Sequence, residues 1–333
     1  MEKMNAAVVT SFGEPPRYQR FDVPQPRTGD EMVVDVLAAG LHPRVRAGAA
    51  GAHYTSAGTL PMIPGIDAVG RRPDGKLVYF VAGDDVMGTM ADKAIADIGR
   101  AVALPDGTDI AKVAAAMNPA MSSWVALRRR VPIEPGQSVL VLGATGNAGR
   151  MAVQVARRLG AGHVIGAGRD PGRLGALAAA GAHDTVQLTG DPDATGRALA
   201  ATAAEVDIVI DYLWGEPAQQ AITALLTARS DRTRTMNWIH IGAQAGPTIE
   251  LPSAALRSAN FRLQGVGQGA VAASDYLAEL PSLIDEINSG AITVTASAVP
   301  LAEVRTAWTR TDPPGQRTVL MPGRNALGRR MTN

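Results

Sequence analysis

The chain has 333 residues, more than one domain usually contains, so two domains or one large α/β unit are expected. It is 46% hydrophobic, 19% charged and 4% aromatic, with 36 glycines and 22 prolines, which is typical of a folded globular protein. The 32 basic and 31 acidic side chains leave a net charge of +1, so no overall field favours nucleic acid or an anionic membrane as a partner. The absence of cysteine excludes disulfides, thiolate catalysis and every zinc site built on cysteine.

The first hundred residues predict a compact, mostly β domain. Short β-type runs such as Val33–Leu37 and Val78–Val81 are separated by glycine and proline, with no long amphipathic helix among them. An Ala-rich helix is expected over Asp109–Arg130, which Pro119 could break, and a turn at Pro132–Gly136 is a plausible boundary. No run is apolar enough for a signal-peptide core or a membrane span, so a cytoplasmic protein is expected.

From Ser138 onward strands and helices alternate, a pattern that specifies parallel strands joined by crossover helices. The expected strands are 139–142, 164–166, 206–210, 238–241 and 261–263, and the expected helices are 150–159 and 172–180. A last long helix over Ser274–Ser289, stopped by Gly290, precedes a short helix near 301–309 and a final strand at 318–321.

The strongest chemical signal is a glycine-rich turn between the strand Val139–Leu142 and the helix that follows it. Gly146 would let the backbone approach a pyrophosphate, and Gly149 would let the helix pack closely on the strand. The helix N-terminus would hold the phosphates with its unpaired N–H groups. The turn residues assigned to dinucleotide binding are Ala144, Thr145, Gly146, Asn147, Ala148 and Gly149. An ordinary βα turn without a ligand is the alternative.

The end of the second strand sets the type of cofactor. An acidic side chain about 20 residues after the last glycine would bind the ribose of NAD, but Gly168 occupies that position. A 2′-phosphate can enter there, and Arg169 and Arg173 can supply the positive charge that it requires. This favours NADPH over NAD. Asp170 is the competing acidic residue, and we interpret it as the N-cap of the next helix.

Several segments, in order along the whole chain, resemble the medium-chain dehydrogenase/reductase superfamily and its zinc-free quinone oxidoreductase-like branch. Residues 60–70 resemble the PGxDxxG segment of the family, 134–141 its entry into the nucleotide fold, 144–149 its AxGxxG fingerprint and 300–304 its C-terminal motif. The resemblance implies an α/β fold in which a Rossmann doubly wound parallel sheet domain is inserted into a GroES-like, mostly β catalytic domain. The expected bounds are 1–122 and 269–333 for the catalytic domain and 123–268 for the Rossmann NADP-binding domain.

Zinc-dependent relatives carry cysteine and then His-Glu at positions that read His42, Ile66 and Asp67 in this sequence. One imidazole and one carboxylate are too few for a catalytic zinc site, which needs about three protein ligands, so no metal is expected. Without a Lewis acid, reduction of an isolated ketone is disfavoured. Quinones and α,β-unsaturated carbonyls need less help, because hydride addition gives a delocalised anion that a hydrogen-bond donor or solvent can protonate. The expected reaction is hydride transfer from NADPH to such an acceptor.

The resemblance also implies which residues face the nicotinamide. Ser122 aligns with a threonine of the family near that ring, although a role in helix packing is as plausible. Ile241, Gly242 and Ala243 resemble a loop whose backbone contacts the nicotinamide amide. Gly267 lies in a second such loop and could equally be a turn former.

Three residues are candidates for contact with substrate. Tyr54 follows the family's placement of a substrate-facing aromatic residue, and a phenol can orient and protonate the acceptor, with packing as the alternative. His42 is either a polar substrate contact or a buried structural histidine. Tyr212, together with Trp214, could line the pocket at a strand end and stack on a planar acceptor, or belong to the core. Asp67 is expected to bond backbone in its turn, and His163, His183 and His240 to be structural.

Other functions stay open. A biosynthetic C=C, C=N or ketone reductase could use the same site, and a non-catalytic NADPH-binding protein is a different class. A homodimer is implied by resemblance alone, through an edge strand such as 235–239 or 261–263. Neither nucleic acid nor membrane is expected as a partner.

Overall fold

The computed structural model describes residues 2–53, 55–56, 58–83, 86–267 and 269–323. The chain divides into two compact units: Met1–Asn118 with Leu280–Asn333 form unit 1, and Pro119–Glu279 form unit 2. The sequence predicts boundaries after residues 122 and 268, whereas this division falls after residues 118 and 279. The predicted domain bounds stay a prediction.

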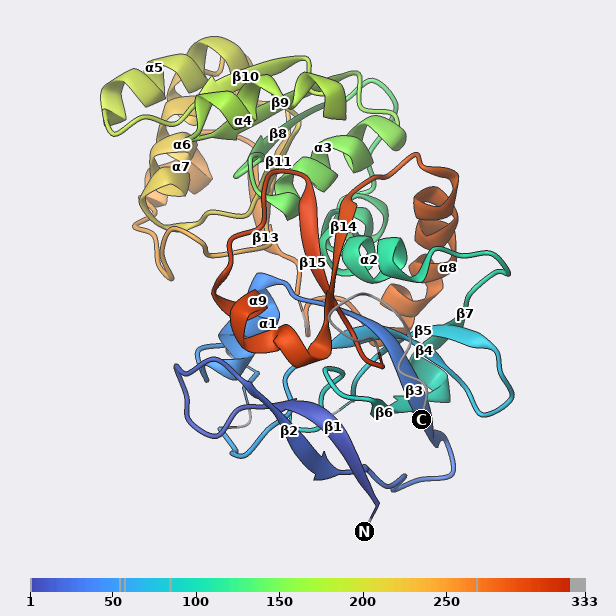
Figure 1. Cartoon of the computed structure of the whole chain (residues 1–333). Coiled ribbons are helices and arrows are strands. Elements are labelled where there is room, and N and C mark those ends of the chain that lie inside the picture. The colour runs from blue at the N-terminus through green and yellow to red at the C-terminus, as the bar shows by residue number, and fades with distance from the viewer. Residues whose placement is uncertain (1, 54, 57, 84–85, 268, 324–333) are drawn as a thin grey trace. The chain divides into compact units, whose positions relative to one another are not determined.

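Unit 1 is built on a mostly antiparallel sheet in the order β14-β15-β3-β4-β5-β7, with β6 also paired to β3 and with β1 and β2 forming a separate ribbon (Figure 1). Its strands are β1 Lys3–Val8, β2 Arg17–Asp22, β3 Glu31–Gly40, β4 Asp67–Arg71, β5 Leu77–Val81, β6 Lys93–Asp97, β7 Ala101–Ala103, β14 Thr295–Pro300 and β15 Gln316–Met321. Its helices are α1 Pro43–Ala49 and α9 Val304–Thr309, with 3₁₀ turns at Ile98–Arg100 and Leu301–Glu303.

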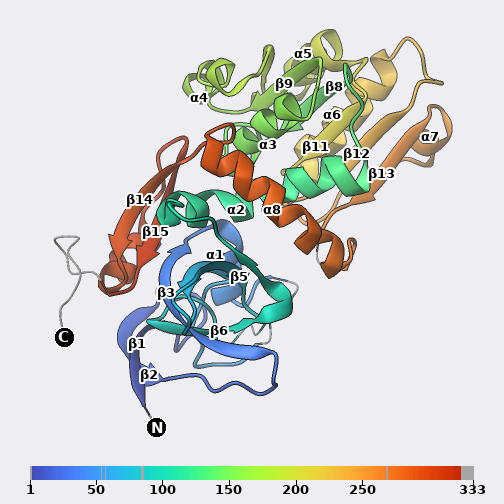
Figure 2. The same cartoon turned by 90° about the vertical axis from the view of Figure 1, so that its right-hand side faces the viewer.

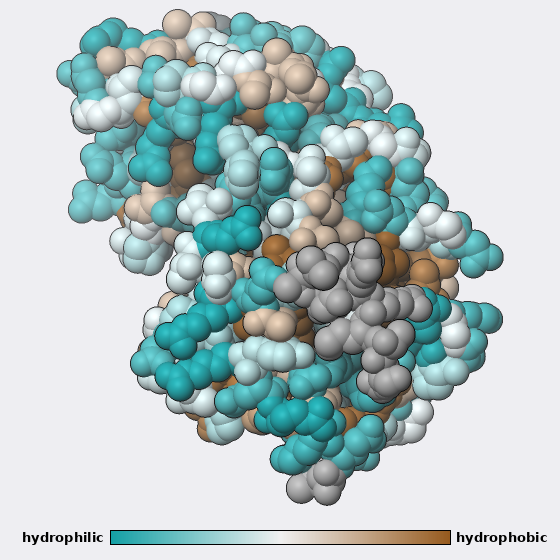
Figure 3. All heavy atoms as spheres, viewed as in Figure 1, coloured by the Kyte–Doolittle hydropathy of each residue, from teal (hydrophilic) through white to brown (hydrophobic). Residues whose placement is uncertain are grey.

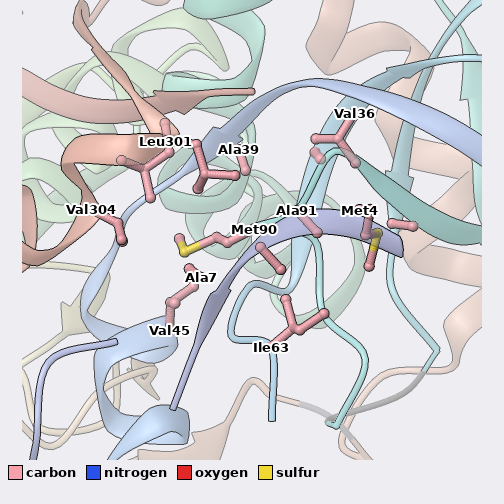
Figure 4. Close-up of a cluster of buried hydrophobic side chains, with 14 of the residues drawn as sticks. Met4, Ala7, Val36, Ala39, Val45, Ile63, Met90, Ala91, Leu301 and Val304 are labelled. Carbon is pink, nitrogen blue, oxygen red and sulfur yellow. The ribbon is translucent and has the colours of Figure 1, made fainter. Parts of the chain in front are cut away.

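The core of unit 1 combines residues from the N-terminal part of the chain with residues from the segment after residue 280. Leu301 and Val304, from the C-terminal segment, belong to the same buried cluster as Ala7, Ala39 and Met90 (Figure 4). Burying apolar surface stabilises a fold in proportion to the area removed from water. The segment after residue 280 therefore completes the β unit that the first part of the chain begins.

Unit 2 is a parallel sheet in the order β10-β9-β8-β11-β12-β13, with helices between successive strands (Figure 2). Its strands are β8 Ser138–Leu142, β9 His163–Gly168, β10 Asp184–Gln187, β11 Ile208–Asp211, β12 Met236–His240 and β13 Phe261–Gly265. Its helices are α3 Asn147–Arg158, α4 Pro171–Gly175, α5 Pro192–Ala203, α6 Gly215–Ala228 and α7 Ser253–Arg257, with a 3₁₀ turn at Ala178–Ala180. The continuous apolar run of β8 is fully buried, as is usual for a strand covered on both faces.

Two long helices carry the chain between the units. They are α2, Ile110–Val125, followed by a π-helical turn at Ala126–Arg130, and α8, Ala273–Ser289. The expected break at Pro119 is wrong, because α2 continues through that residue. The apolar side chains on both sides of it, such as Met117 and Ala120, are buried, and this packing supports a helix that has lost one backbone hydrogen bond.

One expectation about sheet edges is corrected. β12 pairs with β11 on one side and with β13 on the other, so residues 235–239 cannot supply an edge. β13 is the terminal strand in the order of this sheet.

Residues of hydrophilic or intermediate hydropathy cover most of the face of unit 2 that Figure 3 shows. Over the part of the chain that the structure describes, none of the helices combines the length and the apolar character that crossing a bilayer requires.

Candidate functional site

The glycine-rich turn after β8 packs tightly against the start of the helix that follows it. A Cβ atom placed on Gly149 would collide with the carbonyl oxygen of Gly143 and lie 2.7 Å from Cα of Ala144. The first turn of α3 therefore packs directly on the backbone that leaves β8. This confirms the packing role that the sequence predicts for Gly149.

Gly146 has a different reason to be glycine. It is the N-cap of α3 and is exposed, and the nearest protein atom to a Cβ placed there would be Gly143 O, 3.5 Å away. No side chain caps the helix, and its first turn carries no acidic residue. The N–H groups of that turn have no intrahelical partners, so an exposed surface with positive partial charge lies beside the turn. This surface fits an anionic pyrophosphate.

Thr145 of the same turn reaches the end of β9. A Cβ atom on Gly168 would lie 2.5 Å from Cγ2 and 2.7 Å from Oγ1 of Thr145. The carboxyl ends of β8 and β9 are thereby joined by a close contact that leaves no room for a side chain at residue 168. The absence of an acidic side chain at this strand end thus has a steric cause within the fold.

The two arginines assigned to cofactor binding, which follow β9, have different contacts. Asp170 is the N-cap of α4 and accepts from the backbone N–H of Arg173 at 3.1 Å, which confirms its interpretation as a cap. Its carboxylate also pairs with Arg173 Nε at 3.4 Å. Arg169 is exposed, and its carbonyl oxygen accepts from Gln187 at 3.2 Å. Of the two guanidinium groups, Arg173 is therefore already partnered by a carboxylate.

Ser122 and Tyr212 come together in unit 2. The Ser122 Oγ and Tyr212 OH atoms are 3.0 Å apart, and Ser122 also donates to the carbonyl oxygen of Pro119. Tyr212 is 8% exposed, and burial raises the pKa of its phenol to about 12, against the lowering effect of hydrogen bonds with Ser122 and Ser123. Tyr212 is therefore protonated throughout the physiological range and can act only as a neutral donor or acceptor.

The loops after β11 and β12 are locked together by backbone hydrogen bonds. Ile241 N–H donates to Asp211 O at 2.8 Å, and a Cβ atom on Gly242 would lie 3.1 Å from Tyr212 O. The exposed Ala243 follows in the same loop. Gly267 accepts from Ala270 N–H at 3.0 Å, a contact of a turn former. These loops lie at the carboxyl ends of parallel strands, where such sheets bind ligands.

Trp214 has a strained backbone. It is the non-glycine residue with a positive φ angle in the described parts of the chain, at φ 53° and ψ −161°. An outlier of this kind costs about 1–3 kcal/mol and persists where the surrounding structure enforces it.

His42 in unit 1 belongs to a buried polar cluster. His42 Nε2 lies 3.0 Å from Asp67 Oδ1, and Tyr79 OH donates to Asp67 Oδ2 at 2.9 Å. The expectation that the Asp67 side chain bonds backbone is therefore wrong: a nearby imidazole and a phenol satisfy it instead. Burial lowers the pKa of His42, although Asp67 opposes the effect, and burial raises the pKa of Tyr79 well above its usual value. His42 Nδ1 is buried without a partner among the described residues.

One further candidate, Tyr54, lies outside the described residues. A hollow of unit 1 is lined by residues that include Arg44, Val45, Thr55, Ser56, Met62 and Ile66.

The remaining histidines of unit 2 divide into two kinds. His163 Nε2 lies 2.8 Å from an Asp184 carboxylate oxygen, and His183 Nδ1 accepts from Val164 N–H at 2.8 Å, contacts that fit the structural role expected of both. His240 stands at the end of β12, and its buried Nδ1 has no hydrogen-bond partner among the described residues.

The donor set does not fit a zinc ion. Within the ranges that the structure describes, no group of three or more histidine, cysteine, aspartate or glutamate side chains is placed to hold a metal. The carboxylate of Asp67, at the position where zinc-dependent relatives have a ligand, is bonded to His42 and Tyr79 instead.

A parallel sheet in this strand order, with a glycine-rich turn that opens a helix at its central strand, defines a nucleotide-binding Rossmann domain. Comparison with known proteins narrows the class. The family described as zinc-binding dehydrogenase matches residues 148–232. The probable NADPH-dependent quinone reductase tdiC of Emericella nidulans is 30% identical over 362 residues, which cover 96% of this chain and all of that protein.

Solved structures share the fold over nearly the whole chain. The quinone oxidoreductase of Pseudomonas syringae pv. Tomato DC3000 has a TM-score of 0.79 at 22% identity, covering 96% of this chain and 100% of that chain. The quinone oxidoreductase of Thermus thermophilus, which was also solved in complex with NADPH, has a TM-score of 0.76 at 24% identity and the same coverage. The chain belongs to the medium-chain dehydrogenase/reductase superfamily, in its quinone oxidoreductase-like branch. The expected fold, a Rossmann domain combined with a GroES-like domain, is confirmed.

Proposed function

We propose that this protein is an NADPH-dependent oxidoreductase that reduces quinones or α,β-unsaturated carbonyls in the cytoplasm without a metal. The observation that carries the proposal is the open surface at Gly146, beside a helix start that no side chain caps. The full-length similarity to a quinone reductase of Emericella nidulans supports both the cofactor and the acceptor.

The chain's own residues would bind the dinucleotide in two halves. Gly146 and the first turn of α3 would hold the pyrophosphate, and the bare backbone of Gly168 with the exposed Arg169 would accept the 2′-phosphate. On the other side of β8, the loops after β11 and β12 would orient the nicotinamide, with Ser122 and Tyr212 as polar neighbours. When bound, the reduced nicotinamide supplies a hydride to an electron-poor acceptor.

The donor set of the described residues supports zinc independence, because a catalytic zinc needs about three protein ligands. The acceptor must therefore be one that hydrogen-bond donors alone can activate, which favours conjugated carbonyls over isolated ketones. Tyr54 stays the proposed hydrogen-bond donor to the acceptor, and His42 stays a proposed polar contact of the substrate.

The test is turnover of the purified full chain with NADPH or NADH and a panel of quinones, enones and simple ketones. We expect oxidation of NADPH by quinones or enones, and activity that survives a chelator, with no stoichiometric metal in elemental analysis. Turnover confined to ketones, dependence on zinc, or no binding of either coenzyme would overturn the proposal.

We further propose a homodimer that pairs through β13. Among the described strands β13 ends the sheet order and pairs with β12 alone, and we propose that its other side pairs with a second copy. Sedimentation at micromolar concentration should show the dimer, and a monomer alone would contradict it.

A further inference from the structure

Two ring side chains lie against each other where β11 and β12 end. The ring centroids of Trp214 and His240 are 4.2 Å apart, with the ring planes inclined by 37°. In the parallel register, Asp211 of β11 lies opposite His240 of β12, and also opposite Leu142 at the end of β8. The ring pair therefore lies at the same edge of the sheet as the glycine-rich turn, on the side away from β9.

A single buried carboxylate organises this ring pair. Asp211 Oδ1 accepts from the backbone N–H groups of Leu213 at 2.8 Å and Trp214 at 3.0 Å, and Oδ2 accepts from Trp238 Nε1 at 3.1 Å. Oδ2 also lies 4.0 Å from His240 Nδ1. Asp211 thus fixes the turn that carries one ring and faces the other ring. Because burial lowers the pKa of His240, against the opposing charge of Asp211, its imidazole is neutral at pH 7.

The positive φ angle of Trp214 indicates that the fold holds this residue in a strained backbone conformation. Its positive φ is a conformation that glycine adopts without strain, and the side chain is only half-buried. A smaller residue would satisfy the backbone better. Strain of this kind concentrates at ligand sites, and here it keeps a large flat ring at a ligand-binding edge.

We propose that Trp214 and His240 form a stacking wall that recognises the flat conjugated ring of the acceptor and so selects quinones over open-chain enones. The inference rests on the proposed function. The strand order supports the inference. Gly168 and Arg169, the residues proposed to bind the 2′-phosphate, lie on the β9 side of the glycine-rich turn. A dinucleotide that spans the turn would therefore place its nicotinamide half on the β11–β12 side, and the acceptor would bind beside the nicotinamide. Flat electron-poor rings stack on indole and imidazole faces.

Equilibrium binding tests the wall without turnover. The full chain is titrated with 1,4-naphthoquinone in the presence of saturating NADP⁺, and tryptophan fluorescence is recorded. We expect saturable quenching in the wild type and in the control Trp308→Phe, and none above the unspecific background in Trp214→Leu. Equal saturable quenching in Trp214→Leu would overturn the proposal. So would saturable quenching of Trp214 by NADP⁺ alone with no further change on adding quinone, which would assign the wall to the nicotinamide.

Kinetics separate recognition from packing. The ratio of kcat/KM for 1,4-naphthoquinone to that for 3-penten-2-one should fall about tenfold in Trp214→Leu and Trp214→Gly, the value of one good aromatic pair. His240→Ala should lower the ratio, whereas His240→Phe should retain it. Because glycine relieves the strained backbone, the Tm of Trp214→Gly should stay within about 2 °C of the wild type, a shift that corresponds to about 1 kcal/mol in a chain of this length.

An unchanged ratio together with a large fall in Tm would show that Trp214 only packs, and would overturn the proposal. If the wild type binds and oxidises NADPH but the ratios do not change, the wall alone fails. If the wild type binds no coenzyme, the proposed function fails.

Discussion

Thr145 blocks the position at which a dehydrogenase of this fold would carry its ribose-binding acid. Its side chain lies so close to Gly168 that a Cβ atom there would be 2.5 Å from Thr145 Cγ2. Two features therefore exclude a carboxylate at the end of β9: residue 168 is a glycine, and Thr145 fills the space that a side chain there would need.

Gly168→Asp should therefore weaken NADPH binding without creating an NADH site. The carboxylate would repel a 2′-phosphate, and its Cβ would displace Thr145 from the glycine-rich turn. We expect the Kd for NADPH to rise by about tenfold or more, which corresponds to about 1.4 kcal/mol, with no gain for NADH. Isothermal titration calorimetry with each coenzyme measures both effects.

The double variant Thr145→Gly/Gly168→Asp is the matched comparison. It removes the obstructing side chain, so the new carboxylate can reach a ribose hydroxyl, and NADH should bind more tightly than NADPH. Thr145→Gly alone should keep the preference for NADPH. A single Gly168→Asp variant that gained NADH at unchanged Tm would show that Thr145 moves aside freely.

The sequence predicts the nucleotide-binding half well because its signals are local. The run Val139–Leu142, the glycine spacing and the cap at Asp170 each depend on neighbours in the chain, and the structure has all three. The sequence does not predict the helices α5 and α6, because their Ala-rich segments have weak periodicity and tertiary packing decides their structure.

Contacts over long sequence separations could not be predicted from the pattern. Nothing local indicates that Asp67 would meet Tyr79 rather than backbone, or that Ser122 would meet Tyr212, 90 residues later. The sequence suggests only a structural role for His240, because its ring partner Trp214 follows a different strand and is 26 residues away in the chain. A tryptophan directly before a glycine, at a strand end where small residues are commoner, is the one available signal.

Arg169→Ala should weaken NADPH binding selectively. A charge-assisted contact between a guanidinium and a phosphate contributes about 1.5–3 kcal/mol, so the Kd for NADPH should rise by about ten- to 150-fold while that for NADH stays the same. The salt dependence of NADPH binding should also decrease. Arg197→Ala, an exposed arginine on α5, is the control and should change neither Kd. Equal losses for both coenzymes would place Arg169 elsewhere than at the 2′-phosphate.

The buried His42 predicts a loss of stability on acidification. Because burial lowers its pKa in the folded state, the unfolded chain binds more protons between that lowered value and about 6.5, its usual pKa. Stability should therefore be full above about pH 6.5 and decrease as the pH falls below it. Burial also lowers the pKa of His240, so His240 adds to the loss of stability on acidification. Burial raises the pKa of Asp211, so at lower pH its protonation favours the folded state and opposes this loss.

The variant His42→Asn isolates this contribution. It keeps a polar group beside Asp67 but cannot be protonated, so the fall in Tm between pH 7.5 and pH 5.5 should be smaller than in the wild type. His163→Asn, at a histidine whose side chain is 44% exposed, is the matched control and should retain the wild-type fall. Identical pH profiles for His42→Asn and the wild type would mean that His42 is not held neutral in the fold.

Glu279 holds together the helices that carry the chain between the units. It is 2% exposed and pairs with Arg128 and with Arg129 Nε, at 2.5 Å in the latter case, while Oε2 accepts from Trp124 Nε1 at 3.1 Å. The Arg128 guanidinium also lies over the Trp124 ring, 5.1 Å from its centroid. Two of the three consecutive arginines at positions 128–130 therefore neutralise a buried carboxylate.

Glu279→Gln should destabilise the protein without changing coenzyme affinity. The amide can still accept from Trp124, but both guanidinium groups lose their charged partner. Removing one member of a buried pair costs about 3–5 kcal/mol, and the half-exposed arginines reduce this to about 1–3 kcal/mol. Urea unfolding measures the change, and Asp285→Asn, at an exposed position of the same helix, should be neutral. Equal stability of the two variants would show that the Glu279 cluster contributes no more than a surface ion pair does.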